Sequence, residues 1–403
     1  MTTMILQRRT LLTGAALAAP AIIAGRAFAA PQAGSRLLVI FLRGAYDALN
    51  AVPPTAVDFY HDARPGIAIA RPAPSNPASA VALEGPWGLH PVLRDSLLPF
   101  WQKRQLAFVP FAGTDDMSRS HFATQDTIEL GQPIGGSRDY RSGFMARLAG
   151  ILGQAEKPIA FTDQMPLCFR DPSRLFPNLG LAHVGRPMNA RYAKLIEGMY
   201  QDQSALAKSV AEGLVVQDVV FHSLEEEMQQ ASRGAVSTKG FELSARRIGT
   251  VMRDQFNLAF VDVGGWDTHV NQGGATGYLA NRLGELGRGL AGFVEAIGPA
   301  AWQSTTLVVL SEFGRTFREN GGRGTDHGHG TIYWIMGGNI AGGRFAGEQV
   351  DLSPATLNQG RDLPVLTDYR ALLGGLFARQ YGLNSGHLAK VFADIAPKDL
   401  QLI

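Results

Sequence analysis

The stretch Arg36-Leu37-Leu38-Val39-Ile40-Phe41-Leu42 decides the fold class. It is a continuous apolar run, as expected for a strand that is buried on both faces of a sheet. Runs of the same kind occupy residues 106–111, 256–263, 304–310 and 331–336. Helical spacing of apolar residues predicts helices at residues 90–102, 120–130, 278–297 and 368–381. Strands that alternate with helices predict an α/β fold, in which a mostly parallel central sheet carries helices on both faces.

The first 29 residues have the three parts of a secretory signal. The paired Arg8-Arg9 precedes an apolar stretch at residues 11–25, and Ala27-Phe28-Ala29 forms a small-x-small cleavage site. Paired arginines are typical of the twin-arginine variety. The apolar stretch is shorter than the roughly 20 residues that a membrane-spanning helix needs, so we expect cleavage and no stable membrane anchor. The sequence therefore predicts a periplasmic protein that the twin-arginine export machinery delivers.

The composition limits the partners and the covalent structure. Once Arg8, Arg9 and Arg26 leave with the signal, 34 basic residues face 35 acidic ones, a formal charge of −1. This balance argues against a nucleic-acid partner. Cys168 is the single cysteine, so no intrachain disulfide can form. Residues 30–403 are predicted to form a single domain, with a helical insertion at about residues 189–255.

Polar residues gather directly after the predicted strands. In open parallel sheets, ligands bind beyond the carboxyl ends of the strands, so these loops are the expected functional site. They hold four of the nine histidines and several carboxylates. The residues predicted to take part are Arg43, Asp47, Ser118, Ser120, His121, Asp267, His269, Glu312, Arg315, Asp326, His327 and His329.

The segment Asp326-His327-Gly328-His329 is the strongest local indication of a metal site. Two histidines that are two positions apart in an extended segment point to the same side. Asp267 and His269 offer a second carboxylate and imidazole. These ligand types suit one or two divalent ions of zinc, manganese or iron. The structural alternative is a pair of hydrogen-bonded turns.

Four other residues have one functional and one structural interpretation. Asp47 is either a metal ligand or the cap of a helix that begins near Ala48. Glu312 is either a metal ligand or the ion-pair partner of Arg315. Arg43 and Arg315 either bind an anionic substrate or stabilise the fold.

Ser118, Ser120 and His121 lie where a helix is predicted to begin, and we predict catalytic roles for them. The free N–H groups and the positive dipole end of a helix stabilise an anion such as a phosphate. A nearby metal would activate a hydroxyl as the nucleophile. The pattern does not choose between the two serines, and one of them has the alternative role of helix N-cap.

Five motifs in this order resemble domain-of-unknown-function family 1501. They are Leu38-Val-Ile-Phe-Leu-Arg-Gly44, Ser118-Arg-Ser-His-Phe122, Trp266-Asp-Thr-His-Val-Asn-Gln-Gly273, Ser311-Glu-Phe-Gly-Arg-Thr316 and Thr325-Asp-His-Gly-His-Gly330. The resemblance covers about residues 37–379 and implies an alkaline phosphatase-like fold, in the superfamily that also includes the sulfatases.

That resemblance implies a two-metal hydrolase. By position, Asp47 resembles the first ligand, and Ser120 or Ser118 resembles the nucleophile. Asp267 and His269 resemble a later Asp and His pair, and His327 or His329 resembles the last ligand. The superfamily's Asp-His after a later strand is replaced here by Ser311-Glu312, and Asp326-His327 further along offers the same dipeptide.

Two functions follow from these observations. The first is a metal-dependent hydrolase that acts on phosphate, sulfate or related anionic esters. The second is a non-catalytic periplasmic binding or assembly factor with a degenerate hydrolase site. The altered Asp-His motif is the reason to keep the second.

Overall fold

The computed structural model describes residues 34–180 and 240–403. The predicted export signal and residues 189–239 of the predicted insertion lie outside the described residues. Of the remaining residues 240–255, the stretch Phe241–Asp254 is a helix that packs into the main core through Phe241, Ile248 and Val251.

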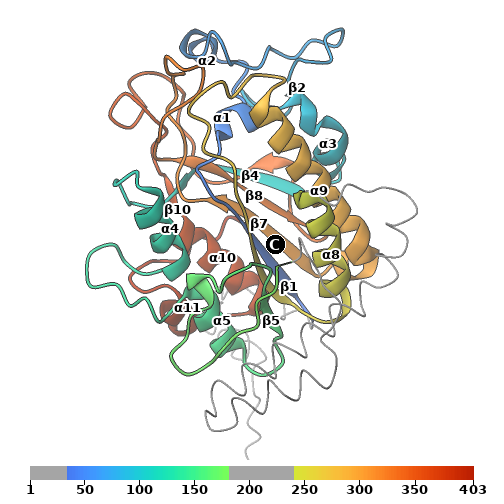
Figure 1. Ribbon diagram of the computed structural model, residues 1–403, viewed down its shortest axis with the longest axis vertical. Helices are drawn as coiled ribbons and strands as arrows, with labels where there is room; N and C mark the ends of the chain where they lie inside the picture. Colours follow the sequence, from blue (N-terminus) through green and yellow to red (C-terminus); the bar gives the residue numbers. More distant parts are fainter. Residues whose placement is uncertain (1–33, 181–239) are drawn as a thin grey trace, which may run out of the picture. The chain divides into compact units, whose positions relative to one another are not determined.

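A central sheet organises the described chain (Figure 1). Strand β1 (Arg36–Leu42) lies between two parallel neighbours, β6 (Leu258–Val263) and β7 (Thr305–Ser311). Strand β5 (Pro158–Ala160) continues the sheet beyond β6. Beyond β7 come β8 (Thr331–Gly337) and β4 (Leu106–Gly113), and then the short strands β9 (Arg344–Phe345) and β10 (Thr367–Asp368), which both pair with β4.

Strand β8 runs opposite to all its companions. It is antiparallel to both β7 and β4, whereas the other pairings in this sheet are parallel. The predicted α/β class with a mostly parallel sheet is therefore confirmed. An apolar run carries no information on direction, so the sequence did not reveal the reversal of β8.

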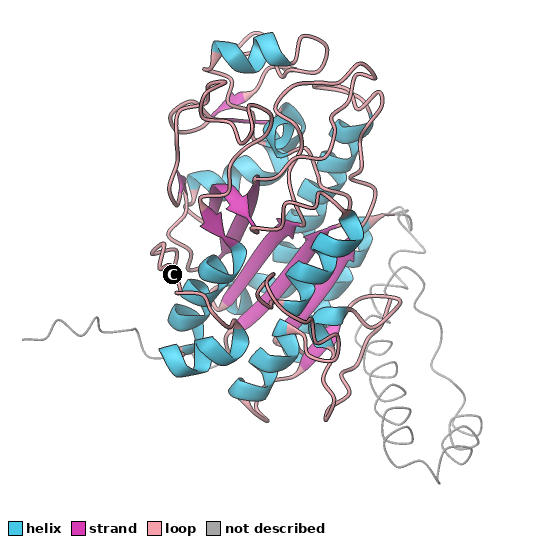
Figure 2. Cartoon of the chain, turned by 90° about the vertical axis from the view of Figure 1, so that its left-hand side faces the viewer, coloured by secondary structure: helices cyan, strands magenta, loops and turns pink. Residues whose placement is uncertain are grey.

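Helices cover both faces of the sheet, as predicted (Figures 1 and 2). One layer contains α3 (Arg94–Gln102), α8 (Phe241–Asp254) and α9 (Tyr278–Trp302). The other contains α4 (His121–Leu130), α5 (Phe144–Leu152), α10 (Tyr369–Tyr381) and α11 (Ser385–Val391). The remaining elements are short: α1 (Ala48–Ala51), α2 (Asp58–Ala63), the 3-10 turns at Pro91–Leu93 and Leu167–Phe169, and the hairpin of β2 (Val81–Ala82) and β3 (Gly88–Leu89).

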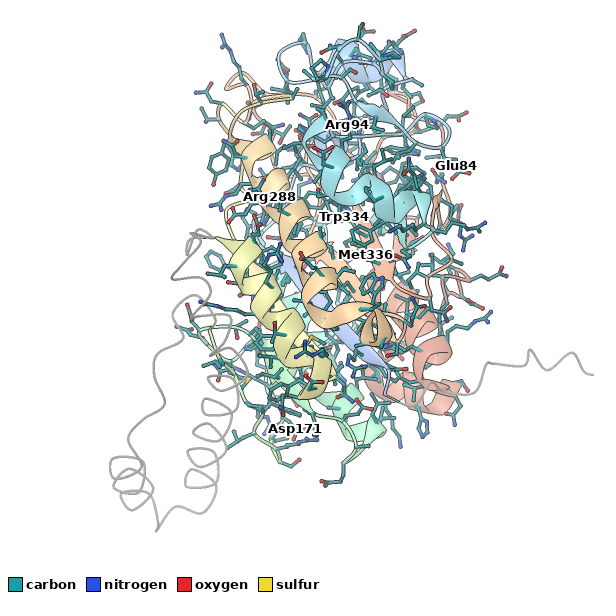
Figure 3. The ribbon with its side chains drawn as sticks, turned by 90° about the vertical axis from the view of Figure 1, so that its right-hand side faces the viewer. Glu84, Arg94, Asp171, Arg288, Trp334 and Met336 are labelled. Carbon is teal, nitrogen blue, oxygen red and sulfur yellow. The ribbon has the colours of Figure 1, made fainter. Side chains whose placement is uncertain are left out.

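The pleat of the buried strands divides the core into two. Leu38, Ile40 and Leu42 of β1 pack in the cluster that includes α3, α8 and α9. The alternate residues Leu37, Val39 and Phe41 pack in the cluster that includes α5, α10 and α11. Strand β8 behaves in the same way, because Trp334 and Met336 belong to the first cluster (Figure 3) and Tyr333 and Ile335 to the second. Burial on both faces explains why both sets of alternating residues in these strands are mostly apolar.

The strands end together at one edge of the sheet. Leu42, the last residue of β1, is paired with Val263 at the end of β6 and with Ser311 at the end of β7. The loops that follow β1, β6, β7 and β4 therefore leave from the same edge, which is where the polar motifs lie. Within the two described ranges, no helix has the length and apolar character needed to cross a bilayer.

Candidate metal centre

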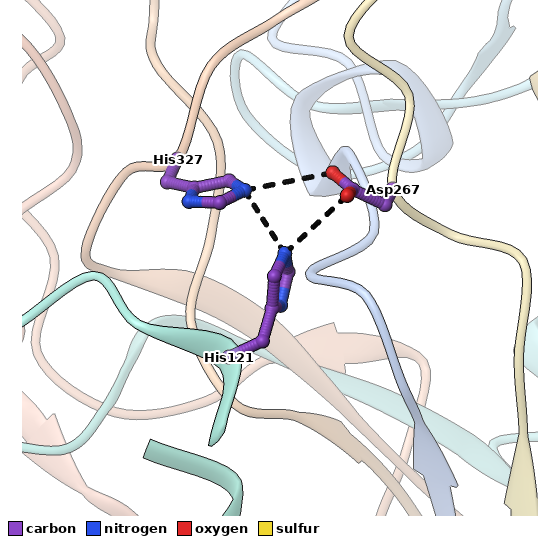
Figure 4. Close-up of side chains that lie close together, drawn as sticks. All are labelled: His121, Asp267 and His327. Atoms are coloured by element: carbon purple, nitrogen blue, oxygen red, sulfur yellow. Dashed lines mark hydrogen bonds and ion pairs between the residues drawn. The ribbon is translucent and has the colours of Figure 1, made fainter. Parts of the chain in front are cut away.

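His121, Asp267 and His327 each bring one ligand atom to within 4.8 Å of the others at this edge (Figure 4), and Nε2 of His269 lies beside two of these atoms. The Nε2 atom of His327 lies 2.9 Å from Nε2 of His121 and 3.0 Å from Nε2 of His269. The Asp267 carboxylate completes the group: Oδ1 is 3.0 Å from Nε2 of His269 and 3.5 Å from Nε2 of His327, and Oδ2 is 3.6 Å from Nε2 of His121. These residues come from the start of α4, the loop after β6 and the loop before β8.

The other ring nitrogen of each histidine faces an acceptor. Nδ1 of His121 lies 2.8 Å from Glu312 Oε1, and Nδ1 of His269 lies 3.2 Å from Asp326 Oδ1. Nδ1 of His327 lies 3.0 Å from the backbone carbonyl of Arg119. Carboxylates and carbonyls only accept hydrogen bonds, so each Nδ1 donates to its acceptor, and a ring protonated there alone offers the lone pair of Nε2 to the centre.

Nitrogen atoms 2.9–3.0 Å apart are joined either by a hydrogen bond, when one ring carries a proton on Nε2, or by a cation that both lone pairs bind. A metal ion fits the spacing, because ligands at about 2.0–2.1 Å around tetrahedral zinc are about 3.3 Å from one another. The measured separations bracket this value. Histidines held through Nδ1 by a carboxylate or a carbonyl are the usual support of metal-bound imidazole. The residues present therefore fit one zinc-like ion.

Burial and nearby charge favour the metal-binding forms of His327 and Asp267. Desolvation lowers the pKa of His327, and the charges of His121 and Arg315 lower it further, so the ring stays neutral. Burial alone would raise the pKa of Asp267, but the hydrogen bond and charge of Arg315 outweigh it, and the pKa lies below its usual value. A neutral imidazole and an ionised carboxylate are the forms that bind a metal.

Glu312 supports His121 and is not one of the converging ligands. Its side chain is completely buried. Besides His121, Oε1 accepts hydrogen bonds from Gly44 N at 2.9 Å and from Gln125 Nε2 at 2.8 Å, and Oε2 accepts one from Ser311 Oγ at 2.7 Å. Burial raises the pKa of Glu312, but these hydrogen bonds more than offset it, so the pKa is lowered and the carboxylate stays ionised.

Asp326 supports His269 in the same way. Asn320 Nδ2 donates to Asp326 Oδ1 at 2.9 Å and to the backbone carbonyl of His269 at 3.0 Å. The hydrogen bond from Asn320 is the main cause of the lowered pKa of Asp326. Glu312 and Asp326, both predicted as metal ligands, thus contact the Nδ1 side of a histidine and not the point where the Nε2 atoms meet.

The two arginines predicted to bind substrate are occupied by protein groups. The Arg315 side chain is fully buried and donates to Asp267, to the carbonyls of Gly44 and Ala45, and to that of Thr325. The hydrogen bond from its Nη2 atom orients the Asp267 carboxylate. Arg43 lies between three acceptors, Asp262 at 2.6 Å, Glu129 at 2.7 Å and Gln125 at 2.9 Å. Neither guanidinium is placed to clamp an anion.

Asp47 and His329 also lie outside the converging group. Asp47 is buried against Arg64, with Oδ2 at 2.6 Å from Nη1, and the same oxygen accepts from Gln272 Nε2 at 2.7 Å. It stands at the N-cap position of α1 without a capping hydrogen bond. His329 is buried, and desolvation lowers its pKa, which the charge of Asp362 partly offsets. The two-residue spacing of His327 and His329 therefore does not bring both to the centre.

Ser120 is the N-cap of α4, and its Oγ accepts a hydrogen bond from Ala123 N at 3.5 Å. It directly precedes the ligand His121. Ser118 is exposed; its Oγ lies 3.3 Å from Thr124 Oγ1 and accepts from Ser120 N at 3.3 Å. The predicted position of both serines at a helix start is confirmed. A helix N-terminus beside the converging ligands favours negative charge there.

Glycines allow the loops that carry the ligands to pack backbone against backbone. Gly314 lies in the loop after β7, and Gly328 lies in the loop before β8. The two loops are joined by a hydrogen bond in which Gly328 N donates to Gly314 O at 2.8 Å. A Cβ atom on Gly314 would lie 1.9 Å from Gly330 O. Any other residue at this position would separate the two loops, which explains the glycines of both motifs.

A family model described as "Protein of unknown function (DUF1501)" matches residues 34–393. The chain belongs to the DUF1501 family. No match was found among curated protein sequences. Among solved structures, the chain is similar to the C-terminal periplasmic domain of EcEptC from Escherichia coli, determined in complex with Zn. That similarity has 11% identity and a TM-score of 0.35, and it covers 75% of this chain and 73% of that one.

Three contributors to the centre of this DUF1501 protein were missed from the sequence. Asn320 joins the loops of His269 and Asp326, and Gln125 links Glu312 to Arg43. The backbone carbonyl of Arg119 holds His327. A neutral amide or a backbone oxygen in a loop has no distinctive sequence pattern. The one available signal was Asn320-Gly-Gly-Arg-Gly324, a turn-forming segment between two conspicuous motifs.

Proposed function

We propose that this protein is an exported, metal-dependent hydrolase of phosphate, sulfate or related anionic esters. The observation that carries the proposal is the convergence of His121, Asp267 and His327, with Nε2 of His269 3.0 Å from His327 and every Nδ1 facing an acceptor. His121, Asp267, His269 and His327 would hold one ion, with zinc the best fit and manganese or iron as alternatives. The relation to the alkaline phosphatase and sulfatase superfamily is part of this proposal.

The surroundings support an anionic substrate. A bound metal would supply Lewis acidity toward an ester oxygen. The α4 N-terminus adds partial positive charge beside the ligand His121. The site is open to water, because the Asp267 side chain is 47% exposed and that of His269 39%. An ester can therefore reach the centre from solvent.

Ser120 is the proposed nucleophile, in preference to Ser118. It adjoins a ligand, and its hydroxyl is at the positive end of α4, where a developing alkoxide is stabilised. The oxygen of the same hydroxyl caps α4 by accepting a hydrogen bond from Ala123 N. At 3.5 Å this hydrogen bond is long and weak, so it hinders nucleophilic attack by the hydroxyl only slightly.

A non-catalytic metal-binding role is the second candidate. Three histidines and one aspartate would fill all four positions of a tetrahedral ion, as in structural zinc sites. Both arginines expected to bind the anion are also occupied by protein groups. A hydrolase would need Asp267 to move away or the ion to accept a fifth ligand.

Metal content and ester hydrolysis together test the proposal. Mature protein, purified after its own export, should contain about one equivalent of zinc, manganese or iron by elemental analysis. His327→Ala should lose the metal, whereas His387→Ala, which removes an exposed histidine outside the group, should retain it. The metal-loaded protein should then hydrolyse a p-nitrophenyl phosphate or sulfate, and Ser120→Ala should abolish that activity. Full metal content without hydrolysis of any ester would favour the non-catalytic role.

The exported location has its own test. Arg8→Lys combined with Arg9→Lys keeps the charge and removes the arginine pair, so it should retain the protein in the cytoplasm. Cell fractionation and the size of the processed chain report the result. Export of the variant at the wild-type level would exclude the twin-arginine route.

A further inference from the structure

Arg119 has a backbone conformation that its residue type rarely adopts. Its φ is +52°, in the left-handed region that favours glycine. In this conformation its carbonyl accepts the hydrogen bond from Nδ1 of His327 at 3.0 Å. The two residues that follow are the helix cap Ser120 and the ligand His121. The Arg119 backbone thus contacts the His327 ring directly, and it also leads into the first residue of α4, His121.

The Arg119 side chain is held at its far end. Its Nη2 lies 3.1 Å from Asp362 Oδ2 and 3.0 Å from Gln359 Oε1, and its Nε lies 3.3 Å from the same Asp362 oxygen. Asp362 is fully buried, and its other oxygen accepts from Asn358 Nδ2 at 3.0 Å. The loop at residues 358–362 therefore anchors the guanidinium.

We propose that Arg119 is a positioning residue for the metal centre, held in its strained conformation by its ion pair with Asp362. This inference rests on the proposed metal centre. Unusual backbone angles persist only where the surroundings impose them, and they concentrate at functional sites. In this inference, the ion pair with Asp362 imposes the positive φ of Arg119. That φ directs the Arg119 carbonyl at Nδ1 of His327.

Loss of the ion pair between Arg119 and Asp362 would displace two of the proposed ligands, His327 and His121. Without the ion pair, the Arg119 backbone is free to leave the left-handed region and its carbonyl turns from His327. The His327 ring then loses the acceptor that fixes its tautomer and direction. The start of α4 shifts with it, and His121 leaves its place 2.9 Å from His327. Loss of such supporting contacts commonly weakens metal binding by about 10–100-fold.

Three variants separate the parts of this inference. Asp362→Asn removes the charge that holds Arg119 and leaves Arg119 unchanged. Arg119→Gly removes the guanidinium but accepts the positive φ without strain, so it should fold. Arg361→Ala is the matched control, because Arg361 also approaches Asp362, at 3.8 Å, but its carbonyl accepts from Phe317 and not from a ligand.

Zinc affinity of the full-length mature protein is the readout, measured by competition with a chromophoric chelator. The visible spectrum of the Co²⁺-loaded protein reports the geometry of the centre, and thermal unfolding of the metal-free forms shows that each variant is folded. We expect Asp362→Asn and Arg119→Gly each to bind zinc about 10–100-fold more weakly, with an altered Co²⁺ spectrum. Arg361→Ala should match the wild type.

Each other result overturns the inference in a recognisable way. Wild-type affinity in both Asp362→Asn and Arg119→Gly would show that the ion pair does not position the centre. Weak zinc binding by Asp362→Asn together with normal zinc binding by Arg119→Gly would show that Asp362 acts on the metal centre through a contact other than Arg119. A wild-type protein that binds no metal would remove the proposed function and this inference together.

Discussion

Replacing Glu312 by glutamine tests whether its charge serves the metal centre or the fold. The substitution keeps the shape of the side chain. If the amide oxygen takes the place of Oε1, it still accepts from Gly44, His121 and Gln125. The amide nitrogen then faces Ser311 Oγ, which already lies 2.6 Å from Leu42 O and can donate there instead. All the local hydrogen bonds are thus satisfied without the negative charge.

The expected magnitudes differ for stability and for metal binding. Glu312→Gln should lower the free energy of unfolding by only about 1–2 kcal/mol, because charged hydrogen bonds become neutral ones. Glu312→Ala leaves three donors without their acceptor and should cost at least about 3 kcal/mol. Zinc affinity of Glu312→Gln should fall about 10–100-fold, because the His121 ring loses the anion that raises its basicity as a ligand.

Urea unfolding of the metal-free proteins measures the first quantity, and chelator competition measures the second. Glu348→Gln is the control for charge removal, because Glu348 is 64% exposed and pairs with Lys398 at 3.8 Å. Wild-type zinc affinity in Glu312→Gln would refute the reasoning. So would a stability loss as large as that of Glu312→Ala, because the amide would then not be satisfied as described.

Three further predictions follow from the same contacts. Asp47→Asn leaves the buried Arg64 without its carboxylate, so urea unfolding should show a loss of about 3–5 kcal/mol at unchanged metal content; metal loss at full stability would make Asp47 a ligand instead. Burial lowers the pKa of His90 to about 4, against about 6.5 when unfolded. The unfolded chain therefore binds more protons between these values, and stability should fall by about 3 kcal/mol as the pH drops from about 6.5 to 4. Urea unfolding at several pH values should show that difference between wild type and His90→Asn, and parallel curves would contradict it. Finally, zinc at about 100 times its dissociation constant should stabilise the metal-free protein by about 2.7 kcal/mol in urea unfolding, and an unchanged midpoint would exclude a site formed only in the folded state.

Much of the fold could be predicted because burial leaves a clear pattern. The run at Arg36–Leu42 is β1 with the predicted bounds, and the predicted strand at residues 304–310 is β7 shifted by one residue. The helix predicted at residues 278–297 extends to Trp302, across a kink at Gly298 and Pro299 where the pattern was expected to stop. Strands of two or three residues, such as β5, are too short to show any periodicity. Such strands form only by pairing with a neighbouring strand of the folded sheet, as β5 does with β6.

The candidate site was located by the rule of strand ends, but individual roles could not be predicted. The loops that hold Asp267, His269 and His327 do meet, because β6, β1 and β7 end in register. Whether a carboxylate binds the ion or supports a histidine depends on a shift of a few ångströms. Glu312 and Asp326 carry the same carboxylate group as Asp267 and differ from it in where the fold places that group. Such differences arise from packing, which residue type and spacing do not record.

The reversed direction of β8 has a consequence for how this architecture tolerates change. A connection between two parallel strands must cross from one edge of the sheet to the other, so altering it disturbs a covering helix. The connection from β7 to β8 leaves and re-enters at a single edge, because these two strands are antiparallel. It holds Arg315, Asp326 and His327, yet it has no helix to displace. A change of length there would shift the site residues that the connection carries, while the covering helices and the strand register stay in place.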